Sequence, residues 1–195
     1  MLSEAVASSL RHLLHALHSL NLPSAVMGGV AVATWNHFRA TKDVDVLLGI
    51  GGQEAGEIIA HLGRFGFRPK RDPPVLTIEG NRIIQLVYQP PDAFLDIQLD
   101  LMLADSPFQQ SALSRRVSVR LPAVDQEVGV VACEDLIILK LLAGRMIDRA
   151  DAAALIRINR NEIDLEHLLE WVRRLGLGDD FEEIWHEAFP GESVS

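Results

Sequence analysis

The chain has 195 residues, of which 48% are hydrophobic, and a formal net charge of −9. This length and apolar content suit one domain, or a compact domain with a helical extension. The excess of negative charge argues against broad binding to DNA, which depends on many lysines and arginines neutralising phosphates. Cys133 has no second cysteine to pair with, and no run of about 18 apolar residues predicts a membrane span. We therefore expect a cytoplasmic protein.

Hydrophobic periodicity predicts alternating helices and strands up to about residue 131 and helices alone thereafter. Apolar residues recur at three- and four-residue spacing in the helices and at two-residue spacing in the strands. The helices are expected over 4–20, 30–36, 53–65, 106–115, 134–142, 148–158, 164–175 and 179–189, and the main strands over 25–27, 43–48, 75–78, 83–88, 94–103, 117–121 and 127–131.

The residues most indicative of a catalytic or binding site lie between Gly28 and Asp45. Gly28 and Gly29 follow a short apolar strand, and Asp43 and Asp45 alternate with valines in the next one. Because a strand has a period of two, both carboxylates point to one side of it. A cation between them would relieve their repulsion, and Mg²⁺ is commonly held by carboxylates together with substrate phosphates. The alternative is that the two aspartates form the solvent-facing half of an ordinary amphipathic strand.

A later strand, 94–103, offers a further carboxylate. Its alternation places Asp96, Gln98 and Asp100 on one face and leucines on the other. A site that holds two metal ions needs a third carboxylate from a neighbouring strand, so that one ion activates the attacking hydroxyl and the other stabilises the leaving group. From the alternation alone, either Asp96 or Asp100 could supply it.

Other charged and polar residues admit two interpretations. Arg39 and Thr41, in the loop before the aspartate strand, either contact a triphosphate or lie in solvent. Lys140, the one cation in an apolar helix, either extends its ammonium to water or reaches a phosphate or the aspartates. Asp148 and Asp151 stand at a helix start, where they either favour the helix dipole whatever the function or belong to a substrate site.

The combined pattern of glycines and aspartates resembles that of a known superfamily of enzymes. Met27-Gly28-Gly29, thirteen intervening residues, Asp43-Val44-Asp45-Val46 and a later acidic strand resemble the nucleotidyltransferase superfamily of the polymerase-β type. Residues 133–145 and 148–151 resemble more narrowly the AbiEii-type nucleotidyltransferases, the toxin halves of certain toxin–antitoxin systems, and their relatives. The resemblance covers about residues 25–175. It implies an α+β nucleotidyltransferase fold, with a central mixed β-sheet flanked by helices in residues 1–132 and a helical C-terminal region packed on it in residues 133–195.

The resemblance also implies roles for single residues. Asp43, Asp45 and Asp100 would bind Mg²⁺ in a two-metal site, with Asp96 as the runner-up for the third position. Gly28 and Gly29 would hold the triphosphate. Lys140, which would match the motif lysine of the subgroup, and Asp148 would contact the nucleotide or the acceptor.

The implied reaction transfers a nucleoside monophosphate from an NTP, such as ATP, GTP or CTP, to an acceptor hydroxyl. The acceptor would be RNA, for example a tRNA end, if the protein is a toxin with a cognate antitoxin. A protein or a small molecule is the alternative acceptor, and a catalytically silent module that binds a nucleotide or a partner is the alternative function.

Overall fold

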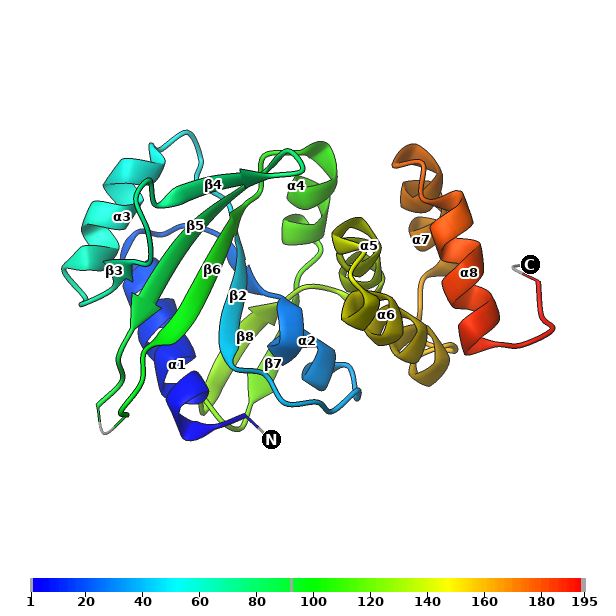
Figure 1. Ribbon diagram of the computed structural model, residues 1–195, viewed down its shortest axis with the longest axis horizontal. Helices are drawn as coiled ribbons and strands as arrows, with labels where there is room; N and C mark the ends of the chain where they lie inside the picture. The colour runs from blue at the N-terminus through cyan, green and yellow to red at the C-terminus, as the bar shows by residue number, and fades with distance from the viewer. Residues whose placement is uncertain (1, 92, 194–195) are drawn as a thin grey trace. The chain divides into compact units, whose positions relative to one another are not determined.

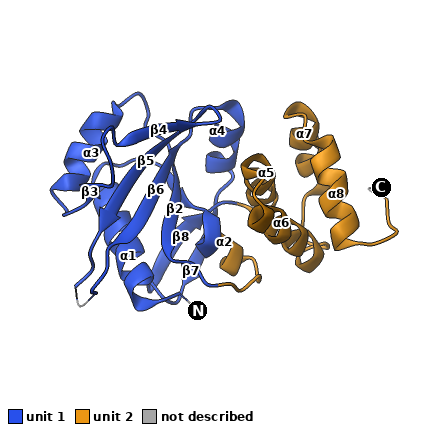
Figure 2. Cartoon of the chain, in the orientation of Figure 1, with its two compact units in different colours: residues 1–30, 40–131 blue, residues 31–39, 132–195 orange. Residues whose placement is uncertain are grey.

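The computed structural model describes residues 2–91 and 93–193. Its backbone contacts divide the chain into two compact units (Figure 2). The first comprises residues 1–30 and 40–131, and the second comprises residues 31–39 and 132–195. The chain passes from the first unit to the second after Val131, and the second unit also includes residues 31–39, which follow the glycine pair.

The strands of the first unit are β1 (Ser24–Val26), β2 (Asp43–Leu48), β3 (Arg68–Pro69), β4 (Val75–Ile78), β5 (Asn81–Tyr88), β6 (Ile97–Leu103), β7 (Val117–Leu121) and β8 (Gln126–Val130). They form one sheet in the order β3-β5-β6-β2-β1-β8-β7, with β4 paired to β5 (Figure 1). The pairs β2–β6 and β1–β8 are parallel, whereas β1–β2 and β5–β6 are antiparallel. The mixed sheet expected from the resemblance is confirmed.

Helices α1 (Glu4–Ser19), α3 (Ala55–Gly63) and α4 (Pro107–Ser114) belong to the first unit, and α2 (Gly28–Thr34) begins in it. The apolar stripe of α1 is buried, and this helix contacts β2 and β6. In α4, the Ser106 hydroxyl accepts from the Gln109 N–H while the Gln109 side chain accepts from the Ser106 N–H. This capping box satisfies two N–H groups at the helix start.

The strand expected from residue 94 begins only at Ile97. Phe94 is 99% exposed and Leu95 is 78% exposed, because the pairing of β6 with β5 ends at the Tyr88–Ile97 position. Asp96 therefore precedes the strand, whereas Asp100 lies within it.

The second unit contains α5 (Cys133–Ala143), α6 (Met146–Ile158), α7 (Leu165–Arg174) and α8 (Gly178–Ala188). Contacts join α5 to α6 and α7, and α8 to α6 and α7. All side chains from Cys133 to Leu141 are buried, including the charged Glu134, Asp135 and Lys140. Of the helices formed by residues 2–91 and 93–193, none is both long enough and apolar enough to span a membrane.

Candidate active site

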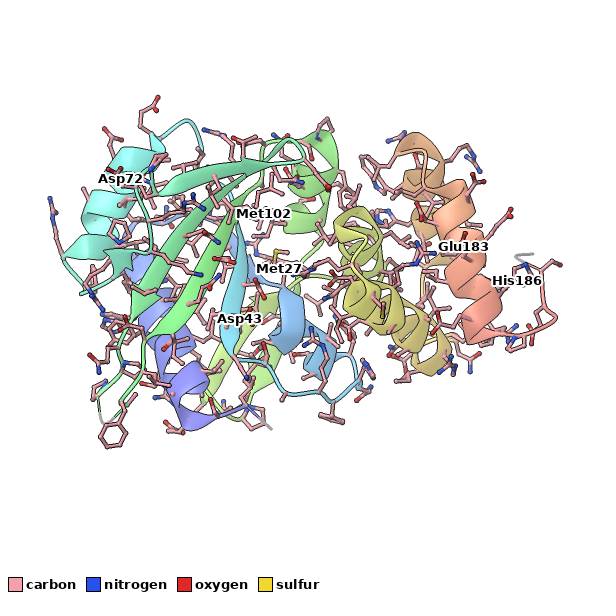
Figure 3. The ribbon with its side chains drawn as sticks, in the orientation of Figure 1. Met27, Asp43, Asp72, Met102, Glu183 and His186 are labelled. Carbon is pink, nitrogen blue, oxygen red and sulfur yellow. The ribbon has the colours of Figure 1, made fainter. Side chains whose placement is uncertain are left out.

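The register between β2 and β6 aligns two of the carboxylates. Asp45 pairs with Asp100, and Asp43 pairs with Gln98, along parallel strands. Asp43 lies on β2 (Figure 3). Partners in register point to the same face of a sheet, so these four polar side chains share one face. The residues between them, such as Val44 on β2 and Leu99 on β6, point to the other face and are fully buried. The sheet thus separates an apolar face from a polar one at this point.

Gly28 lies directly against this polar face. The N–H of the preceding residue, Met27, donates to the Asp45 carbonyl oxygen at 2.9 Å, which ties the end of β1 to β2. Gly28 has a φ of +59°, and a Cβ on it would stand 1.9 Å from Asp45 Oδ2. Only glycine allows both this backbone conformation and this approach. The glycine therefore brings a backbone turn into contact with the carboxylate.

Hydrogen bonds hold the neighbouring carboxylates. The Thr41 hydroxyl donates to Asp43 Oδ1 at 2.8 Å. The Gln98 side-chain amide donates to both oxygens of Asp100 at 3.0 and 2.9 Å, and the Gln85 amide donates to Oδ1 at 3.1 Å. Burial raises the pKa of Asp100, and these amide hydrogen bonds offset only part of the effect. Asp100 is thus a partly desolvated carboxyl group, fixed in orientation by two glutamines.

Asp96, the other candidate for the third carboxylate, has a different environment. It accepts two hydrogen bonds from Arg68 Nη2 at 2.8 and 2.9 Å, and its side chain is 39% exposed. It is not part of the β2–β6 register.

The placement and the chemistry of Asp43, Asp45 and Asp100 suit a divalent cation, since carboxylate oxygens are the donors that Mg²⁺ prefers. As the side chains stand, no group of three or more His, Cys, Asp and Glu residues within 2–91 and 93–193 converges on a metal-binding point. Asp43 is turned to Thr41, and Asp100 is turned to its glutamines. Convergence would require these side chains to rotate, with the strands unchanged.

The second unit assembles its own charged cluster. Lys140 Nζ donates to Asp148 Oδ1 at 2.6 Å and lies 3.0 Å from Asp151 Oδ2. Arg39 Nε donates to both oxygens of Asp151 at 3.0 and 3.1 Å. The side chains of both aspartates are 1% exposed and that of Lys140 is 6% exposed. A buried ammonium needs such partners, so the lysine does not extend to water here.

Arg145 completes the cluster, with its Nε 2.5 Å from Asp148 Oδ2. Burial by itself raises the pKa of Asp148, but the hydrogen bonds from Arg145 and Lys140 outweigh it, so that the pKa is lowered. From the sequence, Asp151 stands out only as a residue at a helix start. Its three-residue spacing from Asp148 was the available signal, because residues three apart share a helix face.

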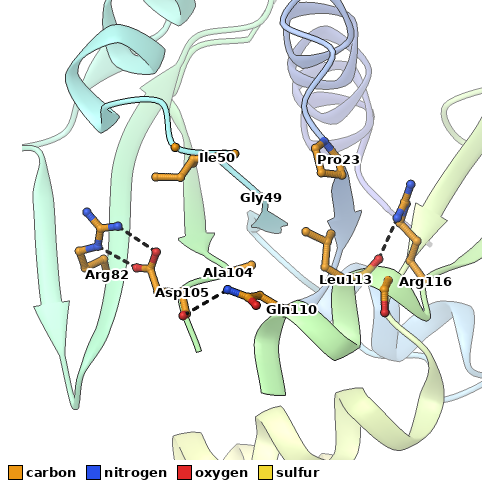
Figure 4. A pocket seen from close by; sticks show the side chains of 12 residues that line it. Pro23, Gly49, Ile50, Arg82, Ala104, Asp105, Gln110, Leu113 and Arg116 are labelled. Atoms are coloured by element: carbon orange, nitrogen blue, oxygen red, sulfur yellow. Dashed lines mark hydrogen bonds and ion pairs between the residues drawn. The ribbon is translucent and has the colours of Figure 1, made fainter. Parts of the chain in front are cut away.

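A cavity of about 600 Å³ lies elsewhere in the first unit, beyond the carboxyl ends of β2 and β6 (Figure 4). Gly49, Arg82, Asp105 and Arg116 are among its lining residues. Arg82 forms two hydrogen bonds with Asp105, at 2.7 and 2.8 Å, and Arg116 donates to the Leu113 carbonyl oxygen. The aspartates of β2 are not part of its lining.

The sequence matches a protein-family model described as nucleotidyl transferase AbiEii toxin, type IV TA system, over residues 10–190. The chain belongs to the AbiEii family. It is therefore a nucleotidyltransferase, and the activity of its class is the transfer of a nucleoside monophosphate. No curated protein matches the sequence significantly.

Solved structures of similar fold are nucleotidyltransferases or resemble them. An antigenic nucleotidyltransferase-like protein from Paracoccidioides brasiliensis is 19% identical, with 93% of this chain and 97% of that chain covered and a TM-score of 0.53. ANT(2″)-Ia in complex with adenylyl-2″-tobramycin is 17% identical, with coverages of 87% and 98% and a TM-score of 0.55. At these identities the similarity shows the fold alone, and it agrees with the family assignment.

Proposed function

We propose that this AbiEii-family chain catalyses a divalent-metal-dependent transfer of a nucleoside monophosphate from an NTP to an acceptor hydroxyl. The observation that carries the proposal is the alignment of Asp45 with Asp100 on parallel strands, with Gly28 against Asp45. This arrangement supplies hard oxygen ligands beside a glycine turn to which phosphates have close access.

In this proposal Asp43, Asp45 and Asp100 hold Mg²⁺, and the turn at Gly28 and Gly29 accommodates the triphosphate. Bound metal ions would polarise the phosphate oxygens and offset the charge that develops on them. The acceptor oxygen forms a bond to the α-phosphorus, and the bond from that phosphorus to the bridging oxygen breaks. Pyrophosphate leaves, and the hydroxyl proton passes to water or to a carboxylate. The protein supplies positioning and charge rather than a covalent nucleophile.

The buried cluster of the second unit is proposed to support nucleotide or acceptor contacts. Asp148 and Asp151 fix the direction of the Lys140 ammonium and the Arg39 guanidinium. The lysine ammonium and the arginine guanidinium are both cations that bind phosphate oxygens in proteins. Thr41 is proposed to act within the first unit, where it orients Asp43.

The family description also supports a proposal on biological role. A chain of a toxin family is proposed to arrest growth by modifying a cellular acceptor and to be neutralised by a cognate antitoxin. Controlled expression of the wild-type chain should then slow growth, and the Asp45→Asn variant at equal protein level should not. Equal growth of the two strains would reject the toxin role without affecting the chemistry.

A transfer assay tests the activity directly. The purified protein is incubated with Mg²⁺, each of four α-labelled NTPs in turn, and either total RNA, cell protein or a metabolite extract. We expect label to enter one acceptor class from wild-type protein and not from Asp45→Asn. Asp125→Asn is the matched control, because it makes the same change at an 83% exposed carboxylate that is distant in sequence from Asp45. It should keep full transfer. Equal labelling by wild type and Asp45→Asn would reject the site.

A further inference from the structure

The cavity beyond the carboxyl ends of β2 and β6 has no part in the proposed transfer. Its volume of about 600 Å³ lies within the range of about 300–1,000 Å³ that is usual for the sites of small molecules. Its walls come from segments that are far apart in the sequence: the residue before β1, the ends of β2 and β6, β5, α4 and the residue before β7 (Figure 4). All of these segments belong to the first unit.

The middle of the cavity is apolar. Gly49 is in close contact with two side chains, since a Cβ on it would stand 2.8 Å from Leu113 Cδ2 and 3.0 Å from Pro23 Cγ. A glycine at this position therefore lets both side chains close on the end of β2. Ile50 and Ala104 also line the cavity. Among the described residues that line it, none is aromatic, so the cavity offers no stacking surface for a nucleobase.

The cation at one end of the cavity is already neutralised. Arg82 Nε donates to Asp105 Oδ2 at 2.7 Å, and Arg82 Nη2 donates to Asp105 Oδ1 at 2.8 Å (Figure 4). The hydrogen bond to Asp105 raises the pKa of Arg82, and the charge of Glu54 adds to this effect. Because two carboxylates act on this arginine, its end of the cavity attracts no further anion.

The cation at the opposite end, Arg116, has no ion pair with any residue of 2–91 and 93–193 (Figure 4). Its Nη1 donates to the Leu113 carbonyl oxygen at 2.8 Å, near the end of α4. Its stem lies against β8, where a Cβ on Gly129 would stand 3.0 Å from Arg116 Cδ. These two contacts hold the guanidinium beside the cavity. Its remaining N–H groups have no acceptor among the described residues, so they are available to a ligand.

We propose that this cavity binds a small monocarboxylic acid with a branched aliphatic body. The carboxylate would lie on Arg116, because a guanidinium binds a carboxylate through two parallel hydrogen bonds. The aliphatic body would lie against Leu113 and Pro23. The lining has two arginines and one aspartate, so a single negative charge balances it. A second negative charge on the ligand would meet no cation, because Arg82 is paired with Asp105.

The proposed site is separate from the catalytic carboxylates and goes beyond the proposed function. Gly49 follows Asp45 by four residues, and Ala104 follows Asp100 by four residues. At about 3.3 Å per residue of strand, the cavity begins about 13 Å from these carboxylates. Binding at this site therefore needs neither a metal ion nor an NTP, and it can be measured without them.

The experiment locates the ligand by NMR. Isotope-labelled wild-type protein, without metal or NTP, is titrated with isocaproate while the backbone amide resonances are followed. We expect the resonances of Gly49, Ala104 and Leu113 to shift and those of Asp43 and Asp45 to stay, with a Kd on the order of 1 mM for so small a probe. Isocaproamide has the same shape without the charge and should bind about tenfold more weakly. Isoamyl phosphate, a dianion at pH 8, should also bind more weakly than isocaproate.

A pair of variants tests the role of the guanidinium. Arg116→Gln should weaken the binding of isocaproate about tenfold and leave the weak binding of isocaproamide unchanged. Arg120→Gln removes the same charge from an exposed arginine on β7 and should bind isocaproate as wild type does. The amide spectrum of each variant reports whether it is folded.

Four results would overturn the proposal. They are the absence of shifts at about 10 mM isocaproate, shifts confined to the residues around Asp45, equal affinity for the acid and its amide, and equal affinity of wild type and a folded Arg116→Gln. Tighter binding of isoamyl phosphate than of isocaproate would refute the preference for a single charge. Loss of nucleotide transfer in Asp45→Asn bears on the proposed function and not on this site.

Discussion

Replacement of Gly28 by alanine tests the closeness of the glycine turn to Asp45. The added Cβ would stand 1.9 Å from Asp45 Oδ2, 2.5 Å from its Cγ and 2.7 Å from its Cβ. Since an ordinary contact begins at 3.4 Å, the carboxylate oxygen must move by 3.4 − 1.9, or about 1.5 Å. Rotation of the carboxylate cannot relieve this, because the Cβ and Cγ of Asp45 are also too close.

The expected loss of activity exceeds the expected loss of stability. Misplacement of a catalytic group by 1 Å can cost about 100-fold in rate, so kcat for nucleotide transfer should fall at least about 100-fold. Alanine at a left-handed φ costs about 1–2 kcal/mol in the free energy of unfolding. For a chain of this size, that conformational cost corresponds to a decrease of about 2–8 °C in Tm, and the overlap with Asp45 lowers the Tm further.

Gly51 provides a matched control. Its φ of +58° is almost the same as that of Gly28, but a Cβ on it would meet nothing within 4 Å. Gly51→Ala should therefore show only the decrease in Tm that the left-handed φ causes, and it should retain full transfer of labelled nucleotide. If Gly28→Ala also keeps its activity within about threefold of wild type, the reasoning that Asp45 must hold its position beside Gly28 is refuted.

Further variants test the remaining assignments. Asp100→Asn should abolish transfer of labelled nucleotide and Asp96→Asn should retain it, and the reverse result would exchange their roles. Lys140→Met leaves the buried Asp148 without one of its partners and should lower the free energy of unfolding in urea by about 3–5 kcal/mol; an unchanged unfolding curve would contradict the burial of this pair. The pKa of Asp148 is lowered in the folded state, so its ionised form stabilises the fold above about pH 4. This contribution is lost as the pH falls through the folded pKa. Asp148→Asn should therefore make the free energy of unfolding depend less on pH in the acid range. Burial raises the pKa of Cys133 to about 12, so alkylation by iodoacetamide at pH 8 should be slow in native protein and fast in urea; rapid native labelling would show an accessible thiol.

The sequence by itself determined the local elements of this protein. Alternation of aspartate with valine around Asp45 predicts a strand with one polar face, and the helix expected over residues 106–115 is observed as α4. These features depend on residues close together in the chain, whose periodicity and capping groups act over a few positions. The family motifs likewise lie in short stretches, and the matched family model agrees with them.

Only the tertiary structure decided which of these residues meet. The alternation of residues 94–103 allowed Asp96 and Asp100 equally, and the strand register then aligned Asp100 with Asp45. Register depends on pairing between segments far apart in the chain, which no local pattern encodes. The same holds for Lys140, for which the sequence left water, a phosphate and the aspartates open. Its ammonium is enclosed by the carboxylates of another helix, because a buried charge is stable only where the folded chain supplies its partners. Its contact with a nucleotide or an acceptor stays a prediction.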